Sequence, residues 1–194
     1  MKLTPRRGIA AAAIAAAAIL LPAVALASSA GTGSAKVASR PAATAQPPRC
    51  LRSYLTSWVG EPGSQTAGST YYQLEISNIS GTTCTLYGYP GVSALGGGSK
   101  QLGSPAGRSP GHKELVVTLS PYQTAHVILQ ITDVYNFPPS ECDPTPAYSL
   151  RVFAPGDFSS TRFPLTFTAC ADRGPVFLHV STTISGTGIP GYTN

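Results

Sequence analysis

The sequence predicts an all-β protein, an antiparallel immunoglobulin-like β-sandwich of about eight short strands. Three observations support this prediction. Apolar and polar residues alternate with period two in one segment after another, as they do in strands with one buried face. Glycine and proline, 20 and 18 of the 194 residues, lie at the junctions between these segments. The four cysteines, an even number, all lie downstream of a segment typical of export.

The N-terminal segment is typical of a secretory signal peptide. Its first seven residues carry three basic side chains, and a nearly continuous apolar run follows over residues 8–26. Ala25-Leu26-Ala27 then offers small residues at the positions that a signal peptidase reads. We therefore expect cleavage after Ala27, removal of residues 1–27 and secretion of the protein. A retained membrane anchor is the alternative, although Pro22 and the many alanines make this run a poor membrane span.

The basic charge of the chain comes largely from this leader. The chain has 13 Lys and Arg against 8 Asp and Glu, a formal net charge of +5. Without the 3 basic residues of the leader, 10 remain against 8, a net charge of +2. No cluster of Lys and Arg is left, so the sequence predicts no nucleic-acid binding. The remaining length suffices for one domain with its own core, and we expect a monomer without a membrane span.

A change in composition divides the exported part in two. Residues 28–49 are rich in Ala, Gly, Ser, Thr and Pro, and they have neither an aromatic residue nor a periodic pattern. Such a segment cannot bury enough apolar surface to offset the entropy cost of ordering. We therefore expect a disordered linker over residues 28–49 and a single β-sandwich domain over residues 50–194.

The first clear strand is predicted over residues 71–77, where Leu74 and Ile76 lie on the buried face. The other clear candidates are residues 115–119, 124–131, 148–152, 163–167 and 177–184, and the weaker ones are residues 51–59 and 92–95. No segment after the linker shows a long helical repeat, which favours a sheet protein throughout. A closed β-barrel is the alternative architecture.

Clusters of glycine and proline predict where the strands end. Gly60-Glu61-Pro62-Gly63 should form a turn, and the polar stretch over residues 96–111 should be a mobile loop. In this scheme Trp58 belongs to the core, whereas His126 and His179 occupy outward positions of their strands. These assignments follow from the alternation alone and depend on each strand having one solvated face.

The cysteines predict two disulfide bonds. An even count in an exported chain implies bridges, and four cysteines allow three connectivities. We favour Cys50–Cys84 with Cys142–Cys170, one bridge in each half of the domain. Each bridge would close a loop of about 30 residues and stabilise the fold by about 3–4 kcal/mol. Zinc binding is disfavoured, because the closest pair is 28 positions apart and no Cys-x-x-Cys is present.

The most specific motif is Asn78-x-Ser80-Gly81-x-x-Cys84-Thr85-Leu86-x-Gly88-Tyr89-Pro90-Gly91. It resembles the signature of an actinobacterial family of secreted domains known as domain of unknown function 4232. Leu119-Ser120-Pro121 is similar to the start of that family's turn into a strand, and Cys142 and Cys170 lie where its second cysteine pair is expected. The resemblance covers roughly residues 50–184. It implies a signal peptide, a linker and a disulfide-bonded β-sandwich, and it implies no activity.

One position departs from the pattern of that family. The residue after Pro121, which is usually glycine, is Tyr122 in this chain. If the turn has a positive φ here, Tyr122 is strained; otherwise the turn must be of another type. The departure concerns one loop and not the fold.

The sequence shows no catalytic or metal-binding pattern. Gly107-Arg108-Ser109-Pro110-Gly111 matches the nucleophile elbow Gly-x-Ser-x-Gly, but Pro110 lacks the N–H group that an oxyanion hole needs after the serine. The histidines have no spacing that suits one metal ion, and acidic residues are few. We therefore expect no catalytic residue, no metal and no cofactor. The alternative is a secreted hydrolase or metal-dependent enzyme whose site forms only in the fold.

Aromatic side chains are the better indication of function. Five of them lie at predicted turns or outward strand positions: Tyr71, Tyr87, Tyr122, Tyr135 and Phe137. Exposed tyrosines provide a large contact area at a low entropy cost, which suits a binding surface. The sequence therefore predicts a secreted, non-catalytic binding or structural module for an envelope or extracellular ligand that it does not identify.

Overall fold

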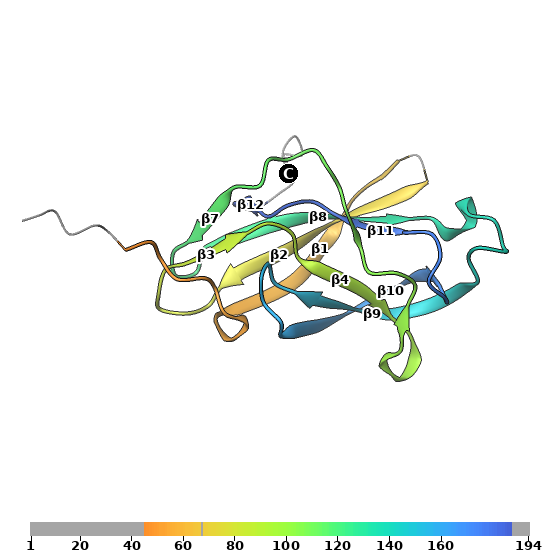
Figure 1. The fold of residues 1–194 in the computed structure, drawn as a ribbon, viewed down its shortest axis with the longest axis horizontal. Coiled ribbons are helices and arrows are strands. Elements are labelled where there is room, and N and C mark those ends of the chain that lie inside the picture. The colour runs from red at the N-terminus through yellow and green to blue at the C-terminus, as the bar shows by residue number, and fades with distance from the viewer. Residues whose placement is uncertain (1–44, 67, 188–194) are drawn as a thin grey trace, which may run out of the picture. The chain divides into compact units, whose positions relative to one another are not determined.

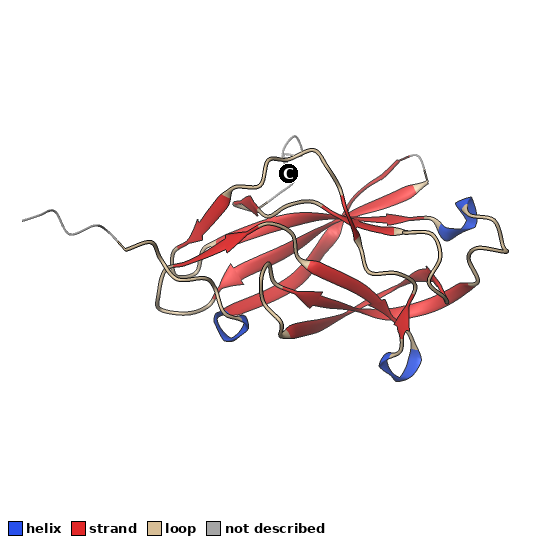
Figure 2. Cartoon of the chain, viewed as in Figure 1, coloured by secondary structure: helices blue, strands red, loops and turns tan. Residues whose placement is uncertain are grey.

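Strands make up nearly all of the regular structure, and the only helices among the described residues are 3-10 turns of three residues (Figure 2). The computed structural model describes residues 45–66 and 68–187, which belong to the unit Thr44–Asn194. The predicted signal peptide and most of the predicted linker lie outside these residues. The prediction of an all-β protein is confirmed. No described helix has the length and apolar character needed to cross a membrane.

The described chain has twelve strands, more than the eight or so that the sequence predicts. They are β1 (Leu55–Thr66), β2 (Ser69–Asn78), β3 (Cys84–Tyr87), β4 (Gly91–Leu95), β5 (Gln101–Leu102), β6 (Gly107–Arg108), β7 (Val116–Leu119), β8 (Thr124–Thr132), β9 (Pro144–Phe153), β10 (Ser160–Cys170), β11 (Leu178–Val180) and β12 (Ile184–Ser185). The 3-10 turns are η1 (Arg52–Tyr54), η2 (Gly97–Ser99) and η3 (Val134–Asn136). Strands β5, β6 and β12 have two residues each, which is too short for an alternating pattern to reveal.

The strands form two larger sheets and a two-stranded ribbon (Figure 1). The six-stranded sheet has the order β1-β2-β8-β11-β6, and β12 also pairs with β8. The four-stranded sheet has the order β10-β9-β4-β5, and β3 pairs with β7 in the ribbon. The named strands pair in antiparallel fashion except for β11 and β6, which are parallel.

Both larger sheets contribute to one hydrophobic core. Its fully buried members include Leu74, Ile76, Val127 and Leu129 from the first sheet and Val92, Ala94, Leu150 and Val152 from the second. The predicted alternation is confirmed in β8, where each odd-numbered residue from 125 to 131 is buried. In β2 the alternation fails, because Glu75 and Ser77 are buried as well as Ile76. Strand β2 lies between β1 and β8, so it has neighbours on both sides.

Three predictions, one of a turn and two of exposure, are wrong. Gly60–Gly63 lies within β1, where the pairing with β2 shifts register on both sides of Pro62; β1 is an edge strand, and edge strands with bulges tolerate proline. Trp58 is 42% exposed, because it pairs with Glu75 and so lies on the face of the sheet opposite to that of Val59 and Leu74, which pack in the core. His126 lies on that same outer face but is only 2% exposed, and its ring nitrogen Nδ1 hydrogen-bonds with the Gly186 carbonyl (2.7 Å).

Residues 96–111, which the sequence predicts to be a mobile loop, contain secondary structure. These elements are η2, β5 and β6, and Leu102 is buried against the core. Strand β5 extends the four-stranded sheet beside β4, and β6 extends the six-stranded sheet beside β11. The segment therefore belongs to both sheets and is not one long loop.

The Gly88-Tyr89-Pro90-Gly91 motif has a structural role. Gly88 has a φ of 90°, which side chains with a Cβ atom rarely adopt. Its carbonyl oxygen accepts hydrogen bonds from the Thr183 N–H (3.0 Å) and from the hydroxyl groups of Thr182 (3.2 Å) and Thr183 (3.0 Å). Residues 181–183 thus separate β11 from β12, which corrects the prediction of one strand over residues 177–184.

Two disulfide bonds reinforce this fold. Cys50 pairs with Cys84 across a Cα–Cα distance of 4.8 Å, and Cys142 pairs with Cys170 across 4.9 Å. These are the two pairs that the sequence favours. The second bridge lies at one end of the four-stranded sheet, since it joins Cys142, just before β9, to Cys170, the last residue of β10.

Candidate binding surface

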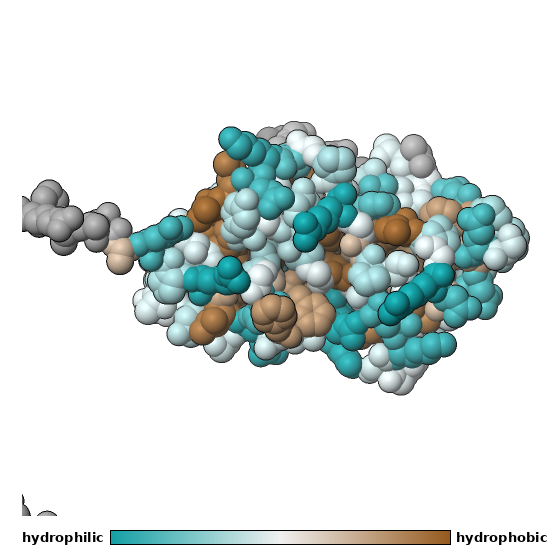
Figure 3. Space-filling model, in the orientation of Figure 1, coloured by the Kyte–Doolittle hydropathy of each residue, from teal (hydrophilic) through white to brown (hydrophobic). Residues whose placement is uncertain are grey.

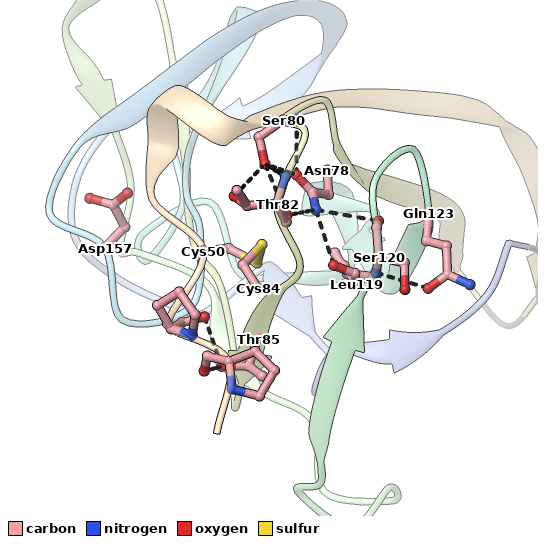
Figure 4. The surroundings of a disulfide bond; sticks show 12 residues. Cys50, Asn78, Ser80, Thr82, Cys84, Thr85, Leu119, Ser120, Gln123 and Asp157 are labelled. Atoms are coloured by element: carbon pink, nitrogen blue, oxygen red, sulfur yellow. Dashed lines mark hydrogen bonds between the residues drawn. A yellow bond between two sulfur atoms is a disulfide. The ribbon is translucent and has the colours of Figure 1, made fainter. Parts of the chain in front are cut away.

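The Cys50–Cys84 bridge attaches the start of the domain to the β3–β7 ribbon. Beside it, the Thr85 N–H donates to the Pro48 carbonyl (2.8 Å), and the Cys50 N–H donates to the Thr85 carbonyl (2.9 Å). Residues 48–50 therefore run as a parallel neighbour of β3. One covalent bond and two backbone hydrogen bonds thus fix where the chain enters the fold (Figure 4).

Asn78 connects the neighbouring loops. Its side chain is fully buried, and its amide nitrogen donates to the carbonyls of Thr82 (2.8 Å), Leu119 (3.0 Å) and Ser120 (3.3 Å). Its amide oxygen accepts from the N–H (3.0 Å) and the hydroxyl (2.7 Å) of Ser80. An asparagine amide both donates and accepts, so this single side chain holds residues 79–83 onto the turn that follows β7 (Figure 4).

That turn carries a tyrosine where glycine is favoured. The Gln123 N–H donates to the Ser120 carbonyl (3.0 Å), Pro121 occupies the second position, and Tyr122 has a φ of 65°. A positive φ at the third position is typical of a type II turn. Of the two sequence-based alternatives, the strained tyrosine is therefore correct. The Tyr122 N–H also donates to the Asn78 carbonyl (2.7 Å), while its side chain is 79% exposed.

Substitution of Tyr122 tests this strain directly. We expect Tyr122→Gly to be about 0.5–1 kcal/mol more stable than the wild type, because relief of about 1–2 kcal/mol of left-handed strain exceeds the entropy of about 0.4–1 kcal/mol that glycine adds to the unfolded state. Tyr122→Ala keeps a Cβ atom and the strain, so it should be less stable than Tyr122→Gly by about the same amount. Urea unfolding of the three proteins measures these differences. An alanine variant as stable as the glycine variant would contradict a strained turn.

The loop between β9 and β10 contacts the same region. The Arg49 guanidinium donates to the Gly156 carbonyl (2.9 Å), and the Arg52 N–H donates to the Asp157 carboxylate (2.6 Å). The Ser159 N–H donates to the other carboxylate oxygen (2.9 Å). Asp157 thereby organises its own loop and attaches it to the segment around η1.

Asp157 has a pKa below its ordinary value of 3.8. The hydrogen bond from the Ser159 N–H is the largest cause; partial burial opposes it, and the Arg52 N–H and charge add to the lowering of the pKa. A lowered pKa in the folded state means that the contact stabilises the fold at neutral pH and is lost as the pH falls through the folded pKa. We therefore expect the amides of Arg52 and Ser159 to lose protection, measured by NMR as the exchange rate relative to the intrinsic rate at each pH, as the pH falls through the folded pKa of Asp157. The Asp157→Asn variant should lack this pH dependence. If the variant still showed the pH dependence, a group other than Asp157 would be its cause.

Four loops therefore meet at one end of the domain, and we call them the tethered end: residues 49–54, 79–83, 120–123 and 154–159. The Ile79 N–H completes the connections by donating to the Tyr54 carbonyl (2.7 Å). Each loop presents one exposed apolar side chain, namely Leu51 (53%), Ile79 (51%), Tyr122 (79%) and Phe158 (95%). These side chains stand on backbone that is fixed by hydrogen bonds to neighbouring loops.

The aromatic residues predicted from the sequence do not converge. Tyr122 belongs to the tethered end, whereas Tyr87 lies on β3 opposite Val116, another exposed residue. On the face of the molecule that Figure 3 shows, apolar side chains gather over β7. Tyr71 lies on β2 in the six-stranded sheet. Tyr135, exposed, and Phe137, packed against the core, lie in and after η3. About 30 Å of β8 separates Tyr122 from η3.

Sequence reasoning missed Leu51, Ile79 and Phe158. A single apolar residue in a loop belongs to no periodic pattern, so alternation could not select it. Phe158 did carry a signal, since it is an aromatic residue in the turn-forming stretch Pro155-Gly156-Asp157-Phe158-Ser159. Nothing in the sequence indicates that this stretch lies next to η1.

Two patterns considered from the sequence, a metal cluster and a nucleophile elbow, are not assembled in the part of the chain that the structure describes. In residues 45–66 and 68–187, no group of three or more His, Cys, Asp or Glu side chains could hold a metal ion. The elbow-like motif begins in β6, but no helix follows Ser109 in the described chain before β7. The motif therefore lacks the strand–turn–helix geometry that a nucleophile elbow needs.

Comparison with known proteins gives a family match. The profile of the family described as "Domain of unknown function (DUF4232)" matches residues 50–183. No curated protein and no solved structure matches the chain. The matched residues include both disulfides and nearly all of the tethered end.

Proposed function

The chain belongs to the DUF4232 family, and we propose that it is a secreted, non-catalytic binding module that contacts an envelope or extracellular protein through the tethered end. One observation carries this proposal: four adjoining loops each present an exposed apolar side chain on a backbone that the other loops hold in place. The module acts as a monomer, and its two disulfides suit an oxidising compartment outside the cytoplasm.

The physical argument concerns the entropy cost of binding. Apolar side chains grouped on an exposed surface are typical of protein contact sites. Loops that are already ordered lose little conformational freedom when a partner binds, which leaves more of the contact energy as affinity. In this proposal the two larger sheets form an immunoglobulin-like sandwich, an architecture whose loops cluster at its ends and often bind other proteins.

A retention experiment tests this function. The full-length chain is immobilised and exposed to detergent-solubilised envelope proteins, and the bound proteins are quantified by mass spectrometry. We expect Phe158→Ser to reduce retention of the specific partner at least about tenfold, because exposed aromatic anchors dominate such contacts. Tyr135→Ser is the matched control, since this exposed aromatic residue lies outside the tethered end. Equal retention by both variants and the wild type would refute the proposal.

A further inference from the structure

A second surface, formed by residues outside the tethered end, contains a hollow lined by polar and apolar side chains. The hollow has a volume of about 320 Å³ and lies beside the six-stranded sheet. Tyr71 of β2, Ile128 and Gln130 of β8, and Ser181 line it from the sheet, and residues 109–112 line it from the segment between β6 and β7. It shares no residue with the tethered end.

Strand register places the sheet residues of the hollow in one row. Tyr71 lies opposite Gln130, and Gln130 lies opposite His179 of β11. Directly opposed residues share a face of the sheet, and the flanking Leu129 and Ile131 belong to the core. The row therefore lies on the face away from the core. The Gln130 side-chain amide donates to the Ser69 hydroxyl (3.0 Å), which fixes its orientation.

The hollow forms where the sheet is interrupted. The Ile128 N–H of β8 donates to the Ser181 hydroxyl (2.9 Å). A side-chain oxygen thus takes the place of the backbone carbonyl that would accept this hydrogen bond in a continuous strand. The Ser181 N–H in turn donates to the Ile128 carbonyl (2.9 Å), after which the chain turns toward Gly88. The opposite wall is fixed to β11, because the Ser109 N–H donates to the Val180 carbonyl (2.8 Å). Both sides of the hollow are thus held by hydrogen bonds.

His179, the cross-strand partner of Gln130, does not itself line the hollow, but it positions the neighbouring strand β6. Its Nδ1 is buried and has no hydrogen-bond partner among the described residues. A Cβ atom at Gly107 would lie 2.9 Å from the ring carbon Cδ2 of His179, so only glycine lets the imidazole lie this close to β6. Because this atom is enclosed by protein, the contacts to a ligand come from the residues that line the hollow and not from His179.

We propose that the hollow binds one ring of a neutral saccharide. Its lining has no Asp, Glu, Lys or Arg, which disfavours a charged ligand. Tyr71 and Ile128 offer apolar area for the C–H face of a sugar ring, while Gln130, His112 and Ser109 offer groups that hydrogen-bond hydroxyls. The volume lies at the lower end of small-molecule sites, which suits a single ring. Residues 109–112 thus supply one wall of the proposed site.

Titration of the full chain with methyl glycosides of glucose, galactose, mannose and arabinose tests the proposal. We expect at least one of them to shift the imidazole NMR signals of His112, which lines the hollow, in a saturable way. Tyr71→Ala should weaken this binding at least about tenfold, as removal of an aromatic anchor does, whereas Tyr71→Phe should retain it. Gln130→Glu is the second variant; it keeps the side-chain size but adds a charge, and it should also weaken binding.

Tyr148→Ala is the matched control, because this exposed tyrosine lies on β9 in the other sheet and should leave binding unchanged. Near-UV circular dichroism verifies that each variant is folded. The proposal is overturned if no neutral glycoside gives a saturable shift, if glucuronate binds more tightly than every neutral sugar, or if Tyr148→Ala loses as much binding as Tyr71→Ala. None of these results bears on protein binding by the tethered end.

Discussion

Asn78→Ala is expected to lower the free energy of unfolding by about 3 kcal/mol. The substitution removes the partner of three carbonyls and of the Ser80 N–H, and Asn78 itself is fully buried. A buried polar group left without a partner costs about 1–3 kcal/mol, and several such groups in one network do not add fully. Urea unfolding of the full chain measures the loss. A loss below 1 kcal/mol would show that water replaces the side chain.

Asn78→Asp separates hydrogen bonding from packing. Aspartate has nearly the same size, but its ionised carboxylate cannot donate and would face the carbonyls of Thr82, Leu119 and Ser120. We therefore expect a loss of stability at neutral pH at least as large as that of the alanine variant. If the aspartate variant were as stable as the wild type, the role of Asn78 as a donor would be wrong.

Removal of the first disulfide, with Cys50→Ala and Cys84→Ala together, should cost about 3–4 kcal/mol. The physical reason is that the bridge restricts the unfolded chain between two residues that are 34 positions apart. The matched control is Cys142→Ala with Cys170→Ala, which opens a loop of 28 positions and should cost a similar amount. Thermal and urea unfolding under non-reducing conditions compare the two double variants.

The two double variants should differ in where they loosen the structure. Only loss of the Cys50–Cys84 bridge frees the segment that holds the loops of the tethered end. We expect hydrogen exchange over residues 79–83 and 154–159 to accelerate in that variant, with weaker retention of the partner. Equal acceleration in the Cys142–Cys170 variant would mean that the tethered end depends on global stability and not on its own bridge.

Local patterns in the sequence predicted many of the strands. The alternation over β8 identified its buried face, because that pattern depends only on neighbouring residues in one strand. The pattern could not tell how many sides of a strand are covered. Trp58 is exposed because the register places it on the face away from the core, whereas His126 on that same face is buried, with Gly186 in contact with its ring. Which segments cover a face of the sheet is a property of the whole fold and is absent from a single strand's sequence.

The sequence by itself predicted an all-β chain, because the alternation that marks a strand is a local property, and it favoured one of three disulfide connectivities. The strained position of Tyr122 was indicated by the resemblance to a family that usually has glycine there. Only the tertiary structure decided which loops share a surface. The hydrogen bond from Asn78 to Leu119 spans 41 positions, and that from Arg49 to Gly156 spans 107. No local pattern encodes such a contact, because it forms only after the sheets have brought distant segments together. The tethered end and the saccharide-sized hollow are both products of that assembly.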